Sequence, residues 1–262
     1  MVAMATPTVW DMHVHLDFMR NLPDVTTEAE RLGVGLFAVT VEPDGYARAQ
    51  EELRDAPWVC LGAGLHPWWV ADGRCDEEEV SRTLERIGQT RYVGEIGLDL
   101  SPKHVPEGSI DRQLHAFEAI AETCAATSDA NAPKVLSIHS VQSAGLALDV
   151  LERTGALASC NCIFHWFSGT SDELHRAVRS GCRFSINEMM LRTRRGREYA
   201  RQLPANRLLL ETDLPPGEDV PFTASQIRSS LMRTAEQLAQ IRGVSTDDIT
   251  TLTQENSFLL LG

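Results

Sequence analysis

The sequence predicts a single α/β domain with the (β/α)₈ TIM-barrel architecture, and three observations support this fold class. The chain has 262 residues, close to the ~250 residues of a typical barrel. Short apolar runs alternate with longer, charge-bearing segments of helical period, as in parallel strands joined by right-handed crossovers. The sequence has no G-x-G-x-x-G or P-loop motif that would favour an open nucleotide-binding sheet. We therefore expect one domain over residues 1–262.

Apolar runs of strand length recur along the whole chain. The expected strands are Val9–His15, Gly35–Val41, Trp58–Leu65, Tyr92–Asp99, Lys134–Ser140, Asn161–Phe167, Cys182–Asn187 and Arg207–Asp213. The segments between and after these strands have hydrophobic residues at helical spacing. The expected helices are Thr27–Leu32, Gly45–Leu53, Glu77–Gly88, Ser109–Ala126, Leu146–Arg153, Ser171–Ser180, Arg194–Gln202, Ala224–Arg242 and a last helix from about Thr246. Ser171 precedes an acidic first turn and is expected to cap its helix.

Composition excludes several classes of protein. Hydrophobic residues make up 43% and charged residues 23% of the chain, which argues against disorder. A net charge of −13 opposes a protein that coats nucleic acid through a broad basic face, although local contacts with a few phosphates remain compatible. Without a signal peptide or a membrane-length apolar run, we expect a cytoplasmic protein with no membrane partner. The 6 cysteines form no C-x-x-C pair, so buried reduced thiols are expected.

Histidines and carboxylates recur where the expected strands end. His13 and His15 lie two apart on the first strand, so both imidazoles point to the same face. In a TIM barrel the C-terminal strand ends hold the reactive groups. The other ionisable residues at such ends are His66, Glu95, Asp99, His139, His165 and Asp213. Imidazoles and carboxylates together predict a divalent-metal centre.

A set of ordered motifs between Asp11 and Pro215 resembles a known family. The motifs are Asp-x-His-x-His-Leu-Asp, Gly-Leu-His-Pro, Gly-Glu-Ile-Gly-Leu-Asp, Ile-His-Ser, His-x-Phe-Ser-Gly and Glu-Thr-Asp-x-Pro. In this order they resemble the TatD-family metal-dependent hydrolases. The resemblance implies a TIM barrel of the metal-dependent hydrolase (amidohydrolase) superfamily. It also implies a divalent-metal phosphodiesterase that acts as a deoxyribonuclease, trimming single-stranded or frayed DNA ends.

The same resemblance implies the ligands of two divalent ions. These ligands are His13, His15, Glu95, His139, His165 and Asp213. Asp213 would join the two histidines of the first strand on one ion, and Glu95 would bridge to the second ion. Two cations ~3.5–4 Å apart polarise a phosphoryl oxygen and stabilise the leaving oxygen. As ligands of these cations, Glu95 and Asp213 are therefore also expected to be catalytic. Zinc, manganese and magnesium all suit such ligands, so the identity of the ions stays open.

Three further residues are expected to face the substrate. His66 resembles a substrate-facing family residue, with a role as general acid or in phosphate contact. Trp68, in the loop after the third strand, can stack an unpaired base, or alternatively only packs that loop. Arg192 opens an arginine-rich segment after the seventh strand, where barrel loops frequently bind phosphate; the alternative is a solvated helix start. The remaining histidines, expected at the surface away from the site, are His104, His115 and His175.

A narrower resemblance, to the TatD-like nuclease component of the Qat anti-phage defence system, rests on three segments. They are Val135–Ser140, His165–Gly169 and Gly181–Asn187. This resemblance implies antiviral defence and protein partners from a defence operon. Two other functions stay open: an amidohydrolase acting on a small amide, ester or modified nucleoside, and a non-catalytic metal-binding subunit of a defence complex. Glu95 stands where many amidohydrolases carry a modified lysine, which favours the nuclease.

Overall fold

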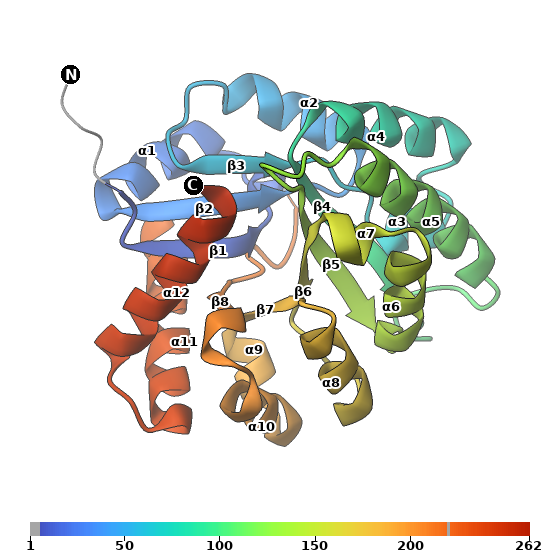
Figure 1. The fold of residues 1–262 in the computed structure, drawn as a ribbon. Helices are drawn as coiled ribbons and strands as arrows, with labels where there is room; N and C mark the ends of the chain where they lie inside the picture. The colour runs from blue at the N-terminus through green and yellow to red at the C-terminus, as the bar shows by residue number, and fades with distance from the viewer. Residues whose placement is uncertain (1–5, 219–220) are drawn as a thin grey trace. The chain divides into compact units, whose positions relative to one another are not determined.

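The computed structural model describes residues 6–218 and 221–262, and parallel strands alternate with helices along them (Figure 1). The predicted α/β class is thereby confirmed. The strands are β1 Val9–Val14, β2 Val34–Val39, β3 Val59–Gly62, β4 Tyr92–Asp99, β5 Val135–Val141, β6 Asn161–His165, β7 Arg183–Ile186 and β8 Leu208–Leu210. The α-helices are α1 Leu22–Leu32, α2 Pro43–Glu52, α3 Pro67–Ala71, α4 Glu77–Gln89, α5 Ile110–Thr127, α6 Ala144–Arg153, α7 Ala156–Ser159, α8 Ser171–Arg179, α9 Glu188–Leu191, α10 Arg194–Gln202, α11 Ala224–Arg242 and α12 Thr246–Leu261. Within the described ranges, no helix combines the length and apolar character needed to cross a membrane.

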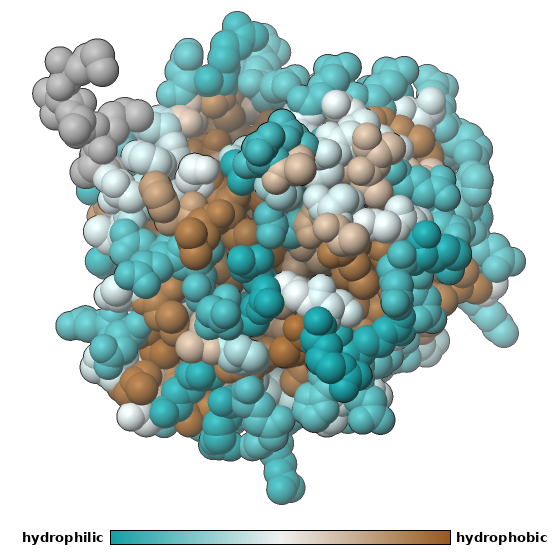
Figure 2. Space-filling view, in the orientation of Figure 1, coloured by the Kyte–Doolittle hydropathy of each residue, from teal (hydrophilic) through white to brown (hydrophobic). Residues whose placement is uncertain are grey.

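These elements belong to two compact units. The first unit holds the described residues of Met1–Ala38, Ala49–Cys60 and Ser185–Gly262. The second unit holds Val39–Arg48 and Leu61–Phe184. Hydrophilic residues predominate on the surface shown in Figure 2, with smaller apolar areas between them.

In the first unit, β1 and β2 are parallel, with Val9 paired to Val34 and Val14 to Ala38. Helices α11 and α12 pack against β1, and α12 also packs against β8 (Figure 1). Every residue of β1 and β8 is buried, because a parallel strand is covered on both faces. The first unit therefore presents the ends of β1 and β8 on neighbouring, tightly packed strands.

In the second unit, β4, β5 and β6 form a parallel set. The register places Gly97 of β4 opposite His139 of β5, and Val135 of β5 opposite Asn161 of β6. Helix α5 packs against β4 and also against α4 (Figure 1). The buried Phe117 of α5 contributes to the apolar core of this unit.

The structure corrects several predicted boundaries. Helix α1 begins at Leu22 rather than Thr27, because a proline in the first helical turn is compatible with the helix. Ser171 is the first residue of α8 and not its cap; Thr170 accepts the capping bond from the N–H of Glu173. Trp68 lies in the short helix α3 rather than in a loop.

All six cysteines are free, and five of them are buried, as predicted.

Candidate metal centre

The first unit brings His13, His15 and Asp213 together at the ends of β1 and β8. Asp213 Oδ1 lies 3.7 Å from His13 Nε2 and 3.4 Å from His15 Nε2. Two ligand atoms that bind one cation at ~2.1 Å with a tetrahedral angle are ~3.4 Å apart. These three side chains therefore fit the coordination of a divalent cation.

Main-chain bonds place these three residues. The N–H of Asp213 donates to His13 O at 2.9 Å, and the N–H of His15 donates to Leu214 O at 2.9 Å. Asp213 has a φ of 58°, in the left-handed region that aspartate tolerates better than most residues. Asp213 lies three residues after the end of β8, and its positive φ together with its main-chain bond to His13 sets the direction of the carboxylate.

Asp11 shares the strand parity of the two histidines but has a different role. It is 0% exposed, and its Oδ1 accepts the N–H of His13 at 3.1 Å and the N–H of Thr212 at 3.0 Å. Its Oδ2 accepts the hydroxyl of Thr212. Burial raises the pKa of Asp11 to about 8, and the hydrogen bonds from Thr212 and His13 offset only part of that effect. The side chain of Asp11 thus links β1 to the segment that carries Asp213, and both of its oxygens are already engaged in hydrogen bonds.

In the second unit, Glu95 lies among three histidines. Its Oε1 is 2.7 Å from His139 Nδ1, 2.8 Å from His165 Nε2 and 3.3 Å from His66 Nε2. The two ring nitrogens of His139 and His165 are themselves 3.3 Å apart. Glu95 is 2% exposed. A carboxylate oxygen and two imidazole nitrogens are donors typical of a divalent-cation site, although the 2.7 and 2.8 Å separations are hydrogen-bond distances that must widen toward ~3.4 Å when all three atoms bind one tetrahedral cation. His66, Glu95 and His139 also form a group able to hold a metal.

Both ring nitrogens of His139 face a carboxylate. Nδ1 contacts Glu95, and Nε2 lies 3.1 Å from Asp99 Oδ2. Burial lowers the pKa of His139, but Asp99 and Glu95 outweigh burial and raise the pKa above its ordinary value. A cation that binds His139 must therefore replace a proton that the two carboxylates hold in place.

The tautomer of His66 follows from its position before α3. His66 Nδ1 accepts the N–H of Trp68 at 3.1 Å, so the proton of the neutral ring is on Nε2. That N–H points toward the Glu95 carboxylate, 3.3 Å away. His66 can therefore donate a proton or a hydrogen bond through Nε2, which fits its predicted substrate-facing role better than a role as metal ligand.

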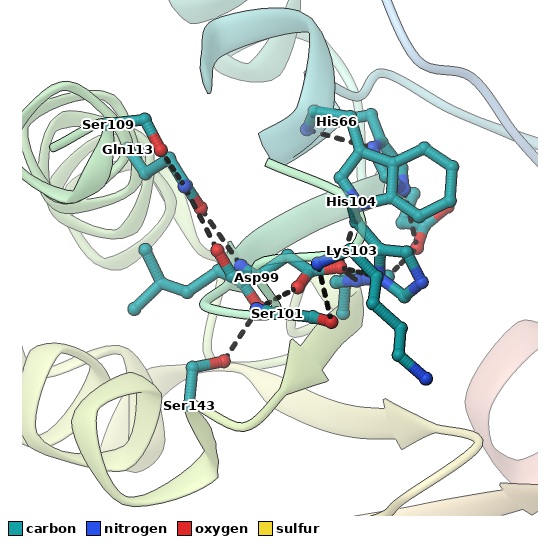
Figure 3. Close-up of polar contacts among 12 residues, drawn as sticks. His66, Asp99, Ser101, Lys103, His104, Ser109, Gln113 and Ser143 are labelled. Atoms are coloured by element: carbon teal, nitrogen blue, oxygen red, sulfur yellow. Dashed lines mark hydrogen bonds and ion pairs between the residues drawn. The ribbon is translucent and has the colours of Figure 1, made fainter. Parts of the chain in front are cut away.

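Asp99 is a functional candidate to which sequence reasoning assigned no role. Figure 3 shows its carboxylate surrounded by donors, including His104. Burial raises the pKa of Asp99, but hydrogen bonds from His139, Trp68 and the Ser101 N–H outweigh burial and lower the pKa to about 2. His104 is exposed, as predicted, but it does not lie away from the site, because its Nδ1 is 2.9 Å from Asp99 Oδ2. The spacing of four from Glu95 to Asp99 on one strand was the available signal, since both face the same side.

Of the three predicted substrate contacts, His66 and Trp68 belong to the second unit and Arg192 to the first. Trp68, in the second unit, is partly exposed, and its indole N–H donates to Asp99 Oδ2 at 2.7 Å. Its ring contacts His66 and His104. Arg192, in the first unit, is exposed and directly follows α9, two residues before the arginines that begin α10. Its position at an exposed helix end fits either of the alternatives predicted for it.

Two glycines permit close main-chain approaches around Glu95 and His139. A Cβ on Gly97, whose φ is 140°, would lie 2.1 Å from His139 O. A Cβ on Gly64 would lie 2.3 Å from Glu95 N and 2.0 Å from Thr40 O. Because these neighbours are backbone atoms, they cannot move aside as a flexible side chain can. Packing therefore requires Gly64 of the Gly-Leu-His-Pro motif and Gly97 of the Gly-Glu-Ile-Gly-Leu-Asp motif.

Comparison with known proteins points to one family. Residues 10–262 match the family described as TatD related DNase. The sequence is 26% identical to "Deoxyribonuclease TATDN3" of Homo sapiens, over 95% of this chain and 93% of that protein. It is also 26% identical to "3'-5' ssDNA/RNA exonuclease TatD" of Citrobacter rodentium, over 97% of this chain and 98% of that protein.

Solved structures show the same fold. The TatD homolog YJJV of Escherichia coli K12 superposes with a TM-score of 0.79 at 21% identity, over 97% of this chain and 98% of that one. A TatD family hydrolase of Entamoeba histolytica superposes with a TM-score of 0.78 at 16% identity, over 99% of both chains. These likenesses agree with the predicted fold class.

Proposed function

The chain belongs to the TatD-related DNase family, and on this premise we propose that it is a metal-dependent phosphodiesterase that trims single-stranded or frayed DNA ends. The observation that supports this proposal most is the position of Glu95 Oε1, 2.7 Å from His139 Nδ1 and 2.8 Å from His165 Nε2. A buried carboxylate among imidazoles is a typical donor set for a catalytic divalent cation. A relative that is 24% identical, YabD of Bacillus subtilis, is named an uncharacterized metal-dependent hydrolase.

We propose that each unit contributes ligands for a divalent ion. His13, His15 and Asp213 would hold an ion in the first unit, and His139 and His165 would hold an ion with Glu95 in the second. Such ions supply Lewis-acid polarisation of the phosphoryl group and lower the pKa of bound water. The mixture of nitrogen and oxygen donors suits zinc, manganese or magnesium.

In this proposal, Asp213 and His66 carry out the two proton transfers. The Asp213 carboxylate, at the turn after β8, accepts the proton of the attacking water. The Nε2–H of His66, fixed by the bond between Nδ1 and the Trp68 N–H, donates to a phosphate or leaving oxygen. The carboxylate of Glu95 supplies negative charge beside the three histidines that it contacts.

Local contacts are proposed to bind the DNA. A net charge of −13 argues against a broad basic face, so a few specific groups must contact the strand. The partly exposed ring of Trp68 offers a surface on which an unpaired base can stack. The exposed Arg192 offers a guanidinium to a phosphate. Because stacking needs an unpaired base, single-stranded or frayed ends are the favoured substrates.

We also propose a role in anti-phage defence with protein partners encoded in the same operon. This part of the proposal rests on the sequence of β5, β6 and β7 with the residues that follow them, which resembles the Qat TatD-like nuclease component. Co-purification of the tagged protein from cells that express its neighbouring genes checks it. Recovery of the protein alone, with unchanged phage sensitivity when its gene is deleted, contradicts this role.

A panel of substrates tests the central function. Purified protein supplied with Mn²⁺, Mg²⁺ or Zn²⁺ is incubated with end-labelled single-stranded DNA, blunt duplex DNA, single-stranded RNA and small amide and ester substrates. We expect shortening of single-stranded DNA at a rate at least about tenfold above that of blunt duplex. Turnover of an amide or ester with no cleavage of any nucleic acid would instead support the amidohydrolase alternative.

Substitution of Arg192 tests the proposed phosphate contact. Arg192→Ala is expected to raise KM for single-stranded DNA about three- to tenfold with little change in kcat, because a contact with distant phosphate acts in substrate and transition state alike. Arg228→Ala, another exposed arginine of the first unit, is the matched control and should leave KM unchanged. Equal KM values for the two variants would remove Arg192 from the binding site.

A further inference from the structure

Asp99, the last residue of β4, accepts hydrogen bonds on both carboxylate oxygens (Figure 3). Oδ1 accepts the Ser101 N–H at 2.7 Å. Oδ2 lies 2.7 Å from Trp68 Nε1, 2.9 Å from His104 Nδ1 and 3.1 Å from His139 Nε2. The side chain is 0% exposed. Because both oxygens of this buried carboxylate already accept hydrogen bonds from the protein, Asp99 is not itself a candidate metal ligand.

The strand register explains why Asp99 reaches His139. His139 of β5 lies opposite Gly97 of β4, and Asp99 lies two residues beyond Gly97. Because Gly97 has no side chain, the main chain of His139 approaches β4 closely, and the imidazole lies between Glu95 and Asp99. Gln113 of α5 fixes the main chain of Asp99 through bonds to its N–H (2.9 Å) and its carbonyl (3.0 Å). The two carboxylates therefore face opposite ring nitrogens of one histidine.

This arrangement determines which nitrogen of His139 is available to a cation. A neutral imidazole has one N–H and one lone pair. When Nε2 donates its proton to Asp99, the lone pair is on Nδ1, which lies beside Glu95 Oε1 and 3.3 Å from His165 Nε2. Metal-binding histidines commonly donate their second ring N–H to a carboxylate, which fixes both the tautomer and the ring orientation.

We infer that Asp99 is a positioning residue that holds His139 in the Nε2–H tautomer, with Nδ1 directed toward Glu95 and His165. This inference rests on the proposed function, because it assigns a role toward the ion proposed for the second unit. The same oxygen also holds Trp68 and His104, one from α3 and one from the segment after β4. Asp99 therefore connects a metal ligand to the aromatic side chain proposed to stack a base.

Metal titration followed by calorimetry tests the role of Asp99 without relying on activity. Wild-type protein is expected to bind Mn²⁺ in two steps. Asp99→Asn should weaken one step by about 10- to 100-fold and leave the other unchanged. Trp68→Phe and His104→Gln each remove one donor to Oδ2 but keep the contact with His139, so they should leave metal affinity unchanged and raise KM for single-stranded DNA. His115→Gln, at an exposed histidine of α5, is the control and should change neither quantity.

Imidazole ¹⁵N NMR of the zinc-loaded wild-type protein supplies a second readout that needs no Asp99 variant. We expect the His139 ring, assigned with a His139→Gln sample, to show a protonated Nε2 and a metal-bound Nδ1. A protonated Nδ1, or an Asp99→Asn protein that binds both ions as tightly as wild type, overturns the inference about Asp99 alone. A wild-type protein that binds no divalent ion overturns both this inference and the proposed function.

Discussion

The candidate ligands of the two units are held in place by different kinds of hydrogen bond. In the first unit, main-chain bonds between Asp213 and His13, and between His15 and Leu214, set the positions of the side chains. In the second unit, side chains hold one another, because Glu95 contacts three histidines and Asp99 contacts one of them from the other side. Loss of one side chain should therefore disturb its neighbours more in the second unit than in the first.

The largest effect is expected from Glu95→Ala. The substitution removes the negative charge that His66, His139 and His165 share, and with it the proposed carboxylate ligand. We expect nuclease activity to fall by at least about 10³-fold and one metal-binding step to disappear. Activity assays and metal titration on the same sample measure both effects. A variant that still binds metal in two steps would show that Glu95 is not a ligand.

Asp213→Asn should lower activity strongly but leave the fold almost unchanged. Asparagine keeps the main-chain bond to His13 and tolerates the left-handed φ of 58°. We expect a loss of about 10²- to 10³-fold in kcat, with a change in the free energy of unfolding below about 1 kcal/mol. Kinetics and urea denaturation check the two parts separately. A large loss of stability would contradict main-chain positioning in the first unit.

Gly97→Ala tests the close packing of β4 on β5. The added Cβ would lie 2.1 Å from His139 O, and the glycine φ of 140° is unfavourable for alanine. We expect the free energy of unfolding to fall by about 2–4 kcal/mol, together with weaker metal binding through His139. Gly73→Ala is the matched control, because Gly73 also has a positive φ, but an added Cβ meets nothing within 4 Å. It should cost only about 1 kcal/mol. Equal losses for the two variants would contradict the packing argument.

The smallest effect is expected from Asp11→Asn. With its pKa raised to about 8, Asp11 can hold a proton on Oδ2 at pH 7 and donate it to the Thr212 hydroxyl, so asparagine, whose amide donates from the same position, should replace it. We expect a change below about 1 kcal/mol in the free energy of unfolding at pH 7. Asp11→Ala should cost about 2–3 kcal/mol, because it leaves the N–H groups of His13 and Thr212 without their acceptor. A large loss in the Asn variant would indicate a charged Asp11.

The order of strands and helices could be predicted because the spacing of hydrophobic residues can be read from neighbouring positions in the sequence. Strand β4 and helices α10 and α11 have the predicted boundaries. The short helices α7 and α9 were missed because four residues are too few to show a period. Local signals also identified His13 of β1 and His15 directly after it, since their shared parity follows from their spacing alone.

The contacts between side chains could not be predicted in the same way. The role of Asp99 depends on the register that places His139 opposite Gly97, which no single strand contains. The role of His104 depends on how the chain returns after β4 to bring its ring to Trp68. Asp11 bonds to Thr212, which lies 201 residues later. Each of these contacts is a property of the folded chain rather than of its motifs.

The central claim, that these histidines and carboxylates form a divalent-metal phosphodiesterase, is tested most directly by metal dependence. Protein depleted of metal by a chelator is assayed on end-labelled single-stranded DNA before and after Mn²⁺ is restored, beside Glu95→Ala prepared identically. We expect cleavage only by the wild-type protein and only after Mn²⁺ is restored. Equal cleavage by both proteins, or full activity without any divalent ion, would contradict it.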